Sequence, residues 1–332
     1  MRFIVLGAGS ISQRHIRNLR NLGHEIAAVF DPSPARLSGI QPLAPSAFLT
    51  DREDEVFRQD ADAALICSPT VFHVRQARTA IQHRLHVFVE KPLAHTLEGT
   101  EALAKEAEQS GRILLVGCNL RFSASLRLAK QLLDSGRIGQ PLSVKAHCGY
   151  YLPHWRPTTD YREGYGARQE TGGGIILDCI HEFDYLRWLF GEVTKVFCWA
   201  GKLSTLEIDV EDNADILLHF GSGAVGNLHL DYLQRTYRRS CEMIGEDGVI
   251  AWDYIDQSVR LFGKEDRHSE VFSPNINTEL NEMFIEEMKH FVACVEGEQQ
   301  PALDAAGGRA VLQIAMAAKE SAARGEVVPI QK

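Results

Sequence analysis

A glycine turn near the N-terminus constrains the fold more than any other part of the chain. The apolar run Arg2-Phe3-Ile4-Val5-Leu6 is typical of a β-strand, and it leads into Gly7-Ala8-Gly9-Ser10-Ile11-Ser12 and a helical pattern over about residues 10–22. A strand, a glycine turn and a helix in this order form the dinucleotide-binding fingerprint. The first glycine permits the tight turn, and the second lets the backbone approach a pyrophosphate at the helix N-terminus. Ser12 occupies the position of the usual third glycine. The alternative to a nucleotide-binding turn is a glycine turn that only reverses the direction of the chain.

The elements that follow predict an α/β chain of two domains. Short β-branched runs at 25–30, 63–67, 86–90 and 113–117 alternate with helical patterns at 52–58, 72–83 and 97–109, which indicates right-handed crossovers and a doubly wound parallel sheet. We therefore expect a Rossmann domain over residues 1–120.

We expect an α+β domain with a large, mostly antiparallel open sheet over residues 121–332. Helices are expected near 124–135 and 175–190, flanking a long polar loop at 150–171. Alternating runs separated by turn signals then predict an antiparallel meander. These runs are 193–202, 213–220, 223–233, 238–244, 248–253 and 258–262. Helices near 278–296 and 304–323 close the chain, and the last is free to pack back on the first domain.

Composition excludes several classes of function. The net charge is −9 with basic and acidic residues interspersed, which argues against a nucleic-acid binder. No apolar stretch approaches the roughly 18 residues that span a membrane. The seven cysteines are odd in number and include no CxxC pair, so we expect reduced thiols in the cytoplasm and neither a disulfide framework nor a metal site.

Residues at the carboxyl ends of the predicted parallel strands are candidates for cofactor binding. Asp31 ends the second predicted strand, where a carboxylate can bind the ribose hydroxyls of a dinucleotide. Because a carboxylate repels a 2′-phosphate, NAD is favoured over NADP. Arg36 could assist the binding of NADP, which remains the alternative cofactor. Ser68, Thr70 and His73 follow the next strand, and Ser68 or Thr70 can instead cap a helix. The full predicted cofactor set is Gly7, Gly9, Ser10, Ile11, Asp31, Ser68, Thr70, His73, Glu90, Lys91 and Asn119.

A charged tripeptide, Glu90-Lys91-Pro92, closes the strand predicted at 86–90. It places an amine at the sheet edge where open α/β sheets bind ligands. The proline fixes the backbone after the lysine, in the trans or the cis form. Lys91 is therefore a candidate for proton transfer or carbonyl polarisation.

A second motif follows the glycines at 172–174. On one helix Asp178, His181 and Asp184 share a face, and the apolar residues Ile176, Ile180, Phe183 and Leu186 lie opposite. A histidine between carboxylates can titrate near neutrality, which suits a general acid–base. The alternative is a histidine whose hydrogen bonds are satisfied inside the core.

The fingerprint at 7–12, Glu90-Lys91-Pro92, Asn119–Arg121 and the 172–184 segment occur in an order that resembles the glucose–fructose oxidoreductase/inositol dehydrogenase (Gfo/Idh/MocA) family. The resemblance implies a sheet face that commonly forms a subunit interface, and hence a homodimer or homotetramer. It also implies that Lys91 polarises or protonates the reacting oxygen, that His181 relays the alcohol proton and that Asp178 orients substrate or histidine. Asp178 precedes His181 by three residues where the family commonly has four, so the spacing departs from the family's pattern at Asp178.

The loop before the second motif mixes aromatic and hydrogen-bonding side chains, which suits a polyhydroxylated small molecule. Several arginines, including Arg235, could pair with a carboxylate or a phosphate on the substrate. The alternative for each residue is a loop held by its own aromatics or by a neighbouring subunit. The predicted substrate set is Lys91, Arg121, Tyr151, His154, Trp155, Arg162, Arg168, Asp178 and His181.

These residues predict an NAD(H)-dependent oxidoreductase of a sugar, sugar acid, nucleotide sugar or cyclitol. The cofactor carries the redox chemistry, and the protein orients it and stabilises the developing alkoxide. One alternative is a lyase, hydratase or glycosidase that oxidises its substrate transiently and regenerates NAD in each turnover. A second is a ligand-sensing regulator that kept the fold and lost catalysis.

Overall fold

Two β-sheets organise the chain. The computed structural model describes residues 1–155, 160–264, 270–272 and 280–330. These fall into one unit of Met1–Asn119 with Leu280–Ala310 and another of Leu120–Glu279 with Val311–Lys332. The later boundary lies inside helix α11 (Ala305–Arg324). Arg156 and Pro157, which belong to the predicted substrate loop, lie outside the described residues.

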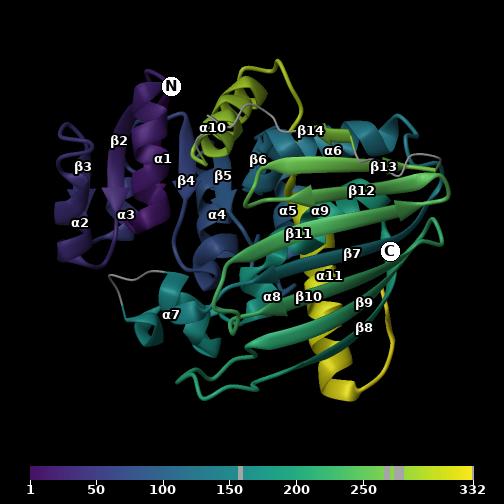
Figure 1. The fold of residues 1–332 in the computed structure, drawn as a ribbon. Helices are drawn as coiled ribbons and strands as arrows, with labels where there is room; N and C mark the ends of the chain where they lie inside the picture. Colours follow the sequence, from purple (N-terminus) through teal and green to yellow (C-terminus); the bar gives the residue numbers. More distant parts are fainter. Residues whose placement is uncertain (156–159, 265–269, 273–279, 331–332) are drawn as a thin grey trace. The chain divides into compact units, whose positions relative to one another are not determined.

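The first unit is built on a six-stranded parallel sheet in the order β3-β2-β1-β4-β5-β6. This order confirms the predicted Rossmann-type doubly wound sheet. Its strands, coloured purple to blue in Figure 1, are β1 (Arg2–Leu6), β2 (Glu25–Phe30), β3 (Phe48–Thr50), β4 (Ala63–Ile66), β5 (His86–Glu90) and β6 (Leu114–Gly117). Its helices are α1 (Ser10–Asn21), α2 (Pro34–Ile40), α3 (Glu53–Val56), α4 (His73–Gln82), α5 (Thr100–Ser110) and α10 (Glu282–Val295).

Both faces of this sheet are buried. Phe3 and Val5 of β1 lie in one apolar cluster with Ile16 of α1 and Phe291 of α10. Ile4 and Leu6 point to the opposite face and are fully buried as well, since successive side chains of a strand alternate. The carboxyl ends of the strands are thus held by packing on both sides, which fixes the loops that follow them.

Two short elements of this unit were not predicted. The edge strand β3 has only three residues, too few for a periodic pattern. Helix α2 carries a recognisable start signal, because the Ser33 hydroxyl accepts from the Arg36 amide and Pro34 occupies the first helical position. Helix α5 begins at Thr100 rather than at residue 97.

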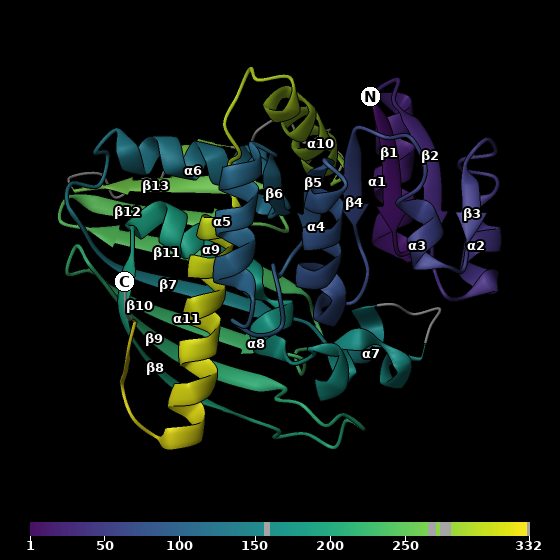
Figure 2. The same cartoon turned by 180° about the vertical axis from the view of Figure 1, so that it is seen from behind.

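The second unit is built on a nine-stranded, mostly antiparallel sheet in the order β14-β13-β12-β11-β7-β10-β9-β8-β15. Helices α6, α9 and α11 (from Val311 onward) lie over one face, as Figure 2 shows. In Figure 1 the opposite face of this sheet is turned toward the viewer. Its strands are β7 (Pro141–Gly149), β8 (Val193–Gly201), β9 (Asn213–Phe220), β10 (Val225–Asp231), β11 (Arg238–Gly245), β12 (Gly248–Asp253), β13 (Ser258–Gly263), β14 (Glu270–Phe272) and β15 (Val328–Pro329). Its helices, apart from α11, are α6 (Ala124–Asp134), α7 (Leu152–Trp155), α8 (Ile175–Asp178) and α9 (Ile180–Phe190).

The predicted antiparallel meander is present in two parts, β8–β9–β10 and β11–β12–β13, which do not adjoin each other in the sheet. Strand β7, which was not predicted, lies between β11 and β10 and runs parallel to β10. Its Val144, Ala146 and Cys148 alternate as buried residues. Lys145 and His147 separate them, so the strand resembles a polar connection in the sequence.

No helix in the described ranges combines the length and apolar character needed to cross a membrane.

Candidate active site

The glycine turn has the geometry that the fingerprint requires. Gly7 has a φ of 97°, and a Cβ there would lie 2.7 Å from the Cys67 carbonyl oxygen, so only glycine fits. A Cβ on Gly9, the N-cap of α1, would meet no atom within 4 Å. Gly7 is therefore packed closely against the neighbouring backbone, whereas there is open space beside Gly9. Ser10 and Ile11 form the first turn of α1, whose amides are available to an anion.

Asp31 lies at this turn. Its side chain is buried, with Oδ2 accepting from the Ala8 amide at 2.9 Å and Oδ1 accepting from the Ser33 amide at 2.9 Å. Arg36 reaches Oδ2 at 3.8 Å while its own side chain stays exposed. A fixed carboxylate beside the glycine turn is the arrangement that binds ribose hydroxyls.

The loop after β4 is held by a buried histidine. His73 places Nε2 2.8 Å from the Ser68 carbonyl oxygen and Nδ1 2.9 Å from the Pro92 carbonyl oxygen. Ser68 donates to the Gln76 side chain, and the N-cap position of α4 is Phe72. The alternative in which Ser68 or Thr70 caps this helix is therefore wrong. His73 instead ties the Ser68–Thr70 loop to the segment that follows Lys91.

Glu90 and Lys91 end β5, and the Lys91–Pro92 peptide bond is cis. Glu90 is mostly buried; its Oε1 lies 2.6 Å from Nε2 of the buried His15, and its Oε2 accepts from the Lys91 amide at 3.2 Å. The backbone that presents Lys91 is thus anchored through the preceding side chain. Asn119 is buried at the start of a 3₁₀ turn after β6.

The predicted helix over 175–190 is two helices. The chain leaves helical geometry at Cys179, so α8 ends at Asp178 and α9 begins at Ile180. Asp178 therefore lies on a different helix from His181 and Asp184, so the three residues do not form one stripe of a single helix. Asp184 is fully buried, as is nearly every residue of α9, and the polar side chains here find individual partners inside the protein.

Asp178 is held by two tyrosines. Tyr165 donates its hydroxyl to Oδ1, and Tyr232 donates to Oδ2 at 2.8 Å. Burial raises the pKa of Tyr232, which keeps its hydroxyl a donor. Both carboxylate oxygens of Asp178 are therefore oriented beside the start of the helix that carries His181.

Two ion pairs flank this region. Arg121 contacts Asp184 through Nε at 2.9 Å and through a terminal nitrogen at 2.8 Å, and both side chains are nearly inaccessible. Arg239 Nε lies 2.8 Å from Oε1 of the buried Glu182. Arg121, predicted to bind substrate, thus belongs to a pair within its own unit.

The predicted substrate loop is largely held by its own side chains. Trp155 donates Nε1 to the Tyr150 carbonyl oxygen at 2.8 Å, and Tyr151 packs against the His154 ring. Arg235 lies 3.6 Å from the centre of the Tyr151 ring. The remaining arginines have acidic neighbours: Arg162 pairs with Asp160 and Glu207, and Arg168 lies 4.0 Å from Asp209. These contacts favour the alternative of a self-structured loop for several of the residues.

The described residues form a hollow in each of the two units. A hollow in the second unit is lined by Trp155, Tyr161, Tyr165 and Asp178, among others. A larger one in the first unit, of about 450 Å³, lies between α4 and residues 94–99. Among the predicted site residues only Thr70 lines the larger hollow, and Arg75 and Arg78 on its wall already pair with Glu53 and Glu106.

Comparison with known proteins decides the family. Residues 1–118 match the NAD-binding Rossmann-fold model of an oxidoreductase family, and residues 126–251 match the GFO/IDH/MocA C-terminal domain. The chain is 30% identical to a myo-inositol 2-dehydrogenase of Thermotoga maritima, covering 97% of this chain and 96% of that one. The chain belongs to the Gfo/Idh/MocA oxidoreductase family.

Further relatives agree with this assignment. A scyllo-inositol 2-dehydrogenase (NAD⁺) of Bacillus subtilis is 27% identical over 100% of this chain and 96% of its own. A levoglucosan dehydrogenase solved with NADH and levoglucosan has the same fold, with a TM-score of 0.90, 21% identity and full coverage of both chains. The predicted family, fold class and NAD cofactor are confirmed, and this Gfo/Idh/MocA member is an NAD-dependent oxidoreductase.

The residues present fit NAD. Gly9 leaves open space where a pyrophosphate would lie, and α1 offers its N-terminal amides beside it. Asp31 holds a buried carboxylate beside the turn, which is the group that would bind the ribose hydroxyls.

Sequence reasoning missed the tyrosines that hold Asp178. Tyr165 was part of the aromatic loop, where nothing in the pattern separates it from its neighbours. Tyr232 follows β10, and its position in the strand pattern indicates only that it is buried. The pairing His15–Glu90 was also missed, although both residues lie in motifs that were recognised.

Proposed function

We propose that this enzyme oxidises a secondary alcohol of a cyclitol or sugar with NAD, and that Lys91 and His181 manage the proton of the reacting hydroxyl. The observation that carries the proposal is the similarity, over nearly the whole chain, to a myo-inositol 2-dehydrogenase. The anchored Lys91 and the fixed Asp178 support it. Sugar acids and nucleotide sugars remain within the same proposed substrate class.

In this proposal, one group of residues binds the cofactor and another acts on the reacting hydroxyl. Gly7, Gly9 and Asp31 hold the cofactor, and Ser68, Thr70, His73 and Asn119 shape the loops on its reactive side. NAD, when bound, supplies the hydride acceptor. Lys91 places a positive charge at the hydroxyl oxygen, which stabilises the alkoxide as it forms. His181 takes the hydroxyl proton as general base.

Asp178 acts on substrate or on His181 from a fixed position. Its carboxylate is oriented by Tyr165 and Tyr232, so it does not have to be ordered when substrate binds. Tyr151, His154 and Trp155 are proposed to contact the substrate ring. Arg121 is not proposed to bind substrate, because its guanidinium group already forms an ion pair with Asp184.

The function is tested by following NADH formation over a panel of inositols, sugars and sugar acids. We expect net NADH with at least one cyclitol or sugar, and a loss of turnover of more than about 100-fold in Lys91→Met and in His181→Gln. Lys105→Met, which removes an exposed lysine from α5, is the matched control and should keep full activity. Substrate conversion without any NADH would contradict the proposal and favour internal recycling of NAD.

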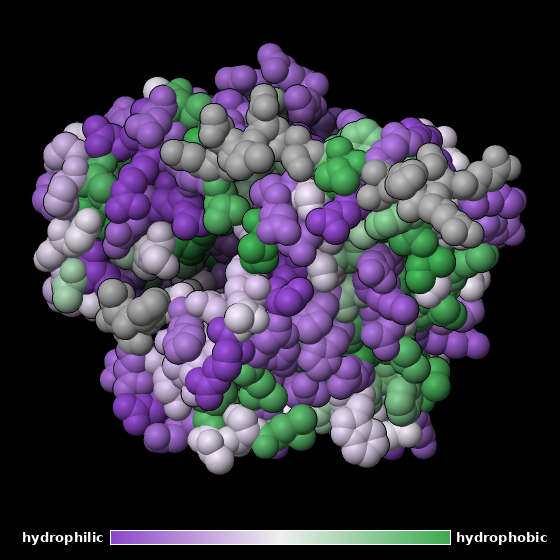
Figure 3. Space-filling model, in the orientation of Figure 1, coloured by the Kyte–Doolittle hydropathy of each residue, from purple (hydrophilic) through white to green (hydrophobic). Residues whose placement is uncertain are grey.

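We also propose that the second unit pairs with another copy of itself through the open face of the sheet, giving a homodimer or homotetramer. Strand residues on this face include the exposed apolar side chains Trp199, Leu217, Val225 and Phe262. Figure 3 shows apolar surface interspersed with polar surface there. Light scattering should give a multiple of the 37.0 kDa chain mass for the wild type and a lower mass for Trp199→Glu/Leu217→Glu. A wild-type monomer would contradict this.

We also propose a cytoplasmic location, which the seven free cysteines support.

A further inference from the structure

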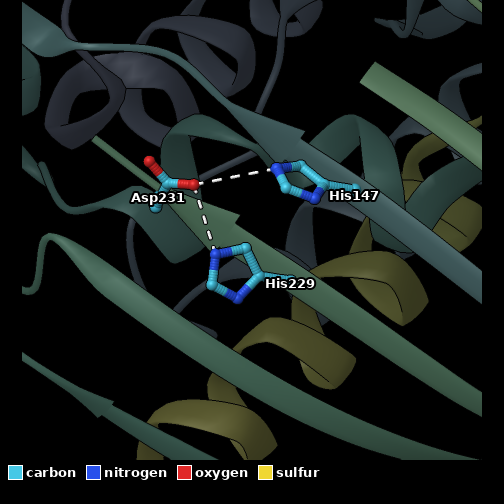
Figure 4. Close-up of side chains that lie close together, drawn as sticks. All are labelled: His147, His229 and Asp231. Carbon is cyan, nitrogen blue, oxygen red and sulfur yellow. Dashed lines mark hydrogen bonds and ion pairs between the residues drawn. The ribbon is translucent and has the colours of Figure 1, made fainter. Parts of the chain in front are cut away.

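We propose that the open face of the nine-stranded sheet carries a binding site for one divalent transition-metal ion, formed by His147, His229 and Asp231 (Figure 4). None of these three residues is among the proposed catalytic residues, although Asp231 directly precedes Tyr232, which holds Asp178. The site lies on the same sheet face as the proposed subunit contact, and the inference does not depend on the proposed oxidoreductase activity. Imidazole and carboxylate ligands favour an ion such as Zn²⁺.

Strand pairing brings the three side chains together. His147 of β7 and His229 of β10 are direct partners in the one parallel strand pair of this sheet within the described ranges. Asp231 lies two residues beyond His229, on the same face of β10. The neighbouring residues Cys148 and Leu230 point to the opposite, helix-covered face and are buried.

The distances suit a metal centre. Asp231 Oδ2 lies 3.2 Å from His229 Nε2 and 3.7 Å from His147 Nε2. Two donors that each lie about 2.0–2.1 Å from a tetrahedral zinc ion are separated by about 3.4 Å. The two distances from Asp231 Oδ2 are therefore close to that spacing, and the ligand atoms of all three residues lie within 4.8 Å of one another.

Outer contacts hold two of the donors in place. Asp231 Oδ1 accepts from the amides of Leu233 at 2.7 Å and Gln234 at 2.6 Å, which turns Oδ2 toward the histidines. His229 Nδ1 lies 2.7 Å from Asp215 Oδ1. A carboxylate on the far nitrogen fixes the tautomer in which Nε2 offers its lone pair, as in carboxylate–histidine–metal sites.

Gly149 clears the space beside the donors. Its backbone is extended, so conformation does not require glycine there. A Cβ at this position would overlap Asp231 Oδ2 and lie 3.0 Å from Gln234 Oε1. Gln234 Oε1 is also 2.8 Å from His147 Nε2, so a possible fourth donor atom lies beside His147.

The rival arrangement is a cluster held by a proton. The hydrogen bond with Asp231, helped by Asp215, raises the pKa of His229 to about 9 in the metal-free protein. A proton and a metal ion compete for the same nitrogen lone pairs. The protonated cluster and the metal-bound cluster therefore have similar side-chain positions and differ in whether a proton or a metal ion is bound. A titration with metal separates them.

A second group of possible ligands, Cys148, Cys179 and Glu182, lies on the covered side and is fully buried. Its Glu182 already pairs with Arg239, whose positive charge opposes a cation. This group nevertheless has to be excluded by the experiment, because thiolates bind the same ions.

The test uses the full-length protein, stripped with EDTA and titrated with Zn²⁺ by calorimetry. We expect one ion per chain. His147→Gln and His229→Gln should each weaken binding more than about 100-fold, and Asp215→Asn, which removes only the outer carboxylate, about 10- to 100-fold. His219→Gln, a histidine on the same face of neighbouring β9, should leave binding unchanged.

Co²⁺ loading of the wild type gives a readout that needs no variant. We expect the intense visible absorption of a tetrahedral ion without a thiolate charge-transfer band. Absence of stoichiometric binding, binding that survives His147→Gln and His229→Gln in folded protein, or a thiolate band would each overturn the proposal. Oxidoreductase activity of the stripped protein is measured in parallel, so that failure of the metal site is distinguishable from failure of the proposed function.

Discussion

His15 Nε2 lies 2.6 Å from Glu90 Oε1 inside the first unit, so the helix that follows the glycine turn is tied to the strand end that carries Lys91. His15 is fully buried and Glu90 is 12% exposed. The same carboxylate accepts from the Lys91 amide. One side chain thus connects the cofactor-binding motif with the proposed catalytic motif.

This connection predicts a positioning role for His15. His15→Gln should lower kcat about 10-fold and change the Kd for NAD little, because the glycine turn stays intact while the Lys91 backbone loses an anchor. Steady-state kinetics and NAD titration measure the two effects. His83→Gln, an exposed histidine after α4, is the control. Equal losses of NAD binding and kcat would indicate a general structural defect instead.

Asp31→Asn tests cofactor choice. The amide can still accept from the Ala8 amide but carries no charge, so the repulsion of a 2′-phosphate is lost. We expect the ratio of kcat/KM for NAD to that for NADP to fall about 10-fold. Asp51→Asn, an exposed acid after β3, should leave it unchanged. A wild type that already prefers NADP would refute this role of Asp31.

Tyr232→Phe tests the orientation of Asp178. A hydrogen bond to a charged group contributes about 1.5–3 kcal/mol, so its loss should lower kcat about 10-fold or more. Asp178→Asn should lower kcat at least as much, and adding Tyr232→Phe to it should cost little more, because both act through one carboxylate. Tyr237→Phe is the control. If the effects of the two substitutions on kcat were fully additive in free energy, Tyr232 would not act through Asp178.

His73 predicts a pH-dependent stability. Burial lowers the pKa of His73, and hydrogen bonds to the Ser68 and Pro92 carbonyls offset only part of this. Its folded pKa lies below the unfolded value of about 6.5, so its contribution is complete above that pH and is lost as pH falls through the folded pKa.

Thermal unfolding between about pH 7.5 and about pH 5 measures this effect. The wild type should lose more stability on acidification than His73→Gln, even though the variant starts from a lower midpoint. His83→Gln should follow the wild-type slope. Parallel curves for wild type and His73→Gln would show that His73 does not titrate in this range.

Most of the Rossmann unit, apart from the short elements β3 and α2, could be predicted because its sequence signals are local. A β-branched strand, a glycine turn and an amphipathic helix follow one another without a gap from Arg2 to Asn21, and the repeat of this pattern sets the sheet order. The turn chemistry at Gly7 needs only the neighbouring residues and one contact with Cys67.

The second unit was predicted less well because its pattern depends on contacts between distant residues. The place of β7 follows from pairing with β10 and β11, which lie far along the chain. The break at Cys179 is equally invisible, since Ile175–Phe190 has helical periodicity throughout. The partners of Asp178 and Arg121 come from other segments, and no spacing rule marks them.

Transfer of deuterium is the most direct test of the central claim. A substrate from the panel carrying deuterium on the reacting carbinol carbon is turned over with NAD, and the reduced cofactor is analysed by mass spectrometry. Our account predicts one deuterium in each NADH formed, with the rate of this transfer reduced more than about 100-fold in Lys91→Met. Unlabelled NADH, or product formed without reduced cofactor, would contradict it.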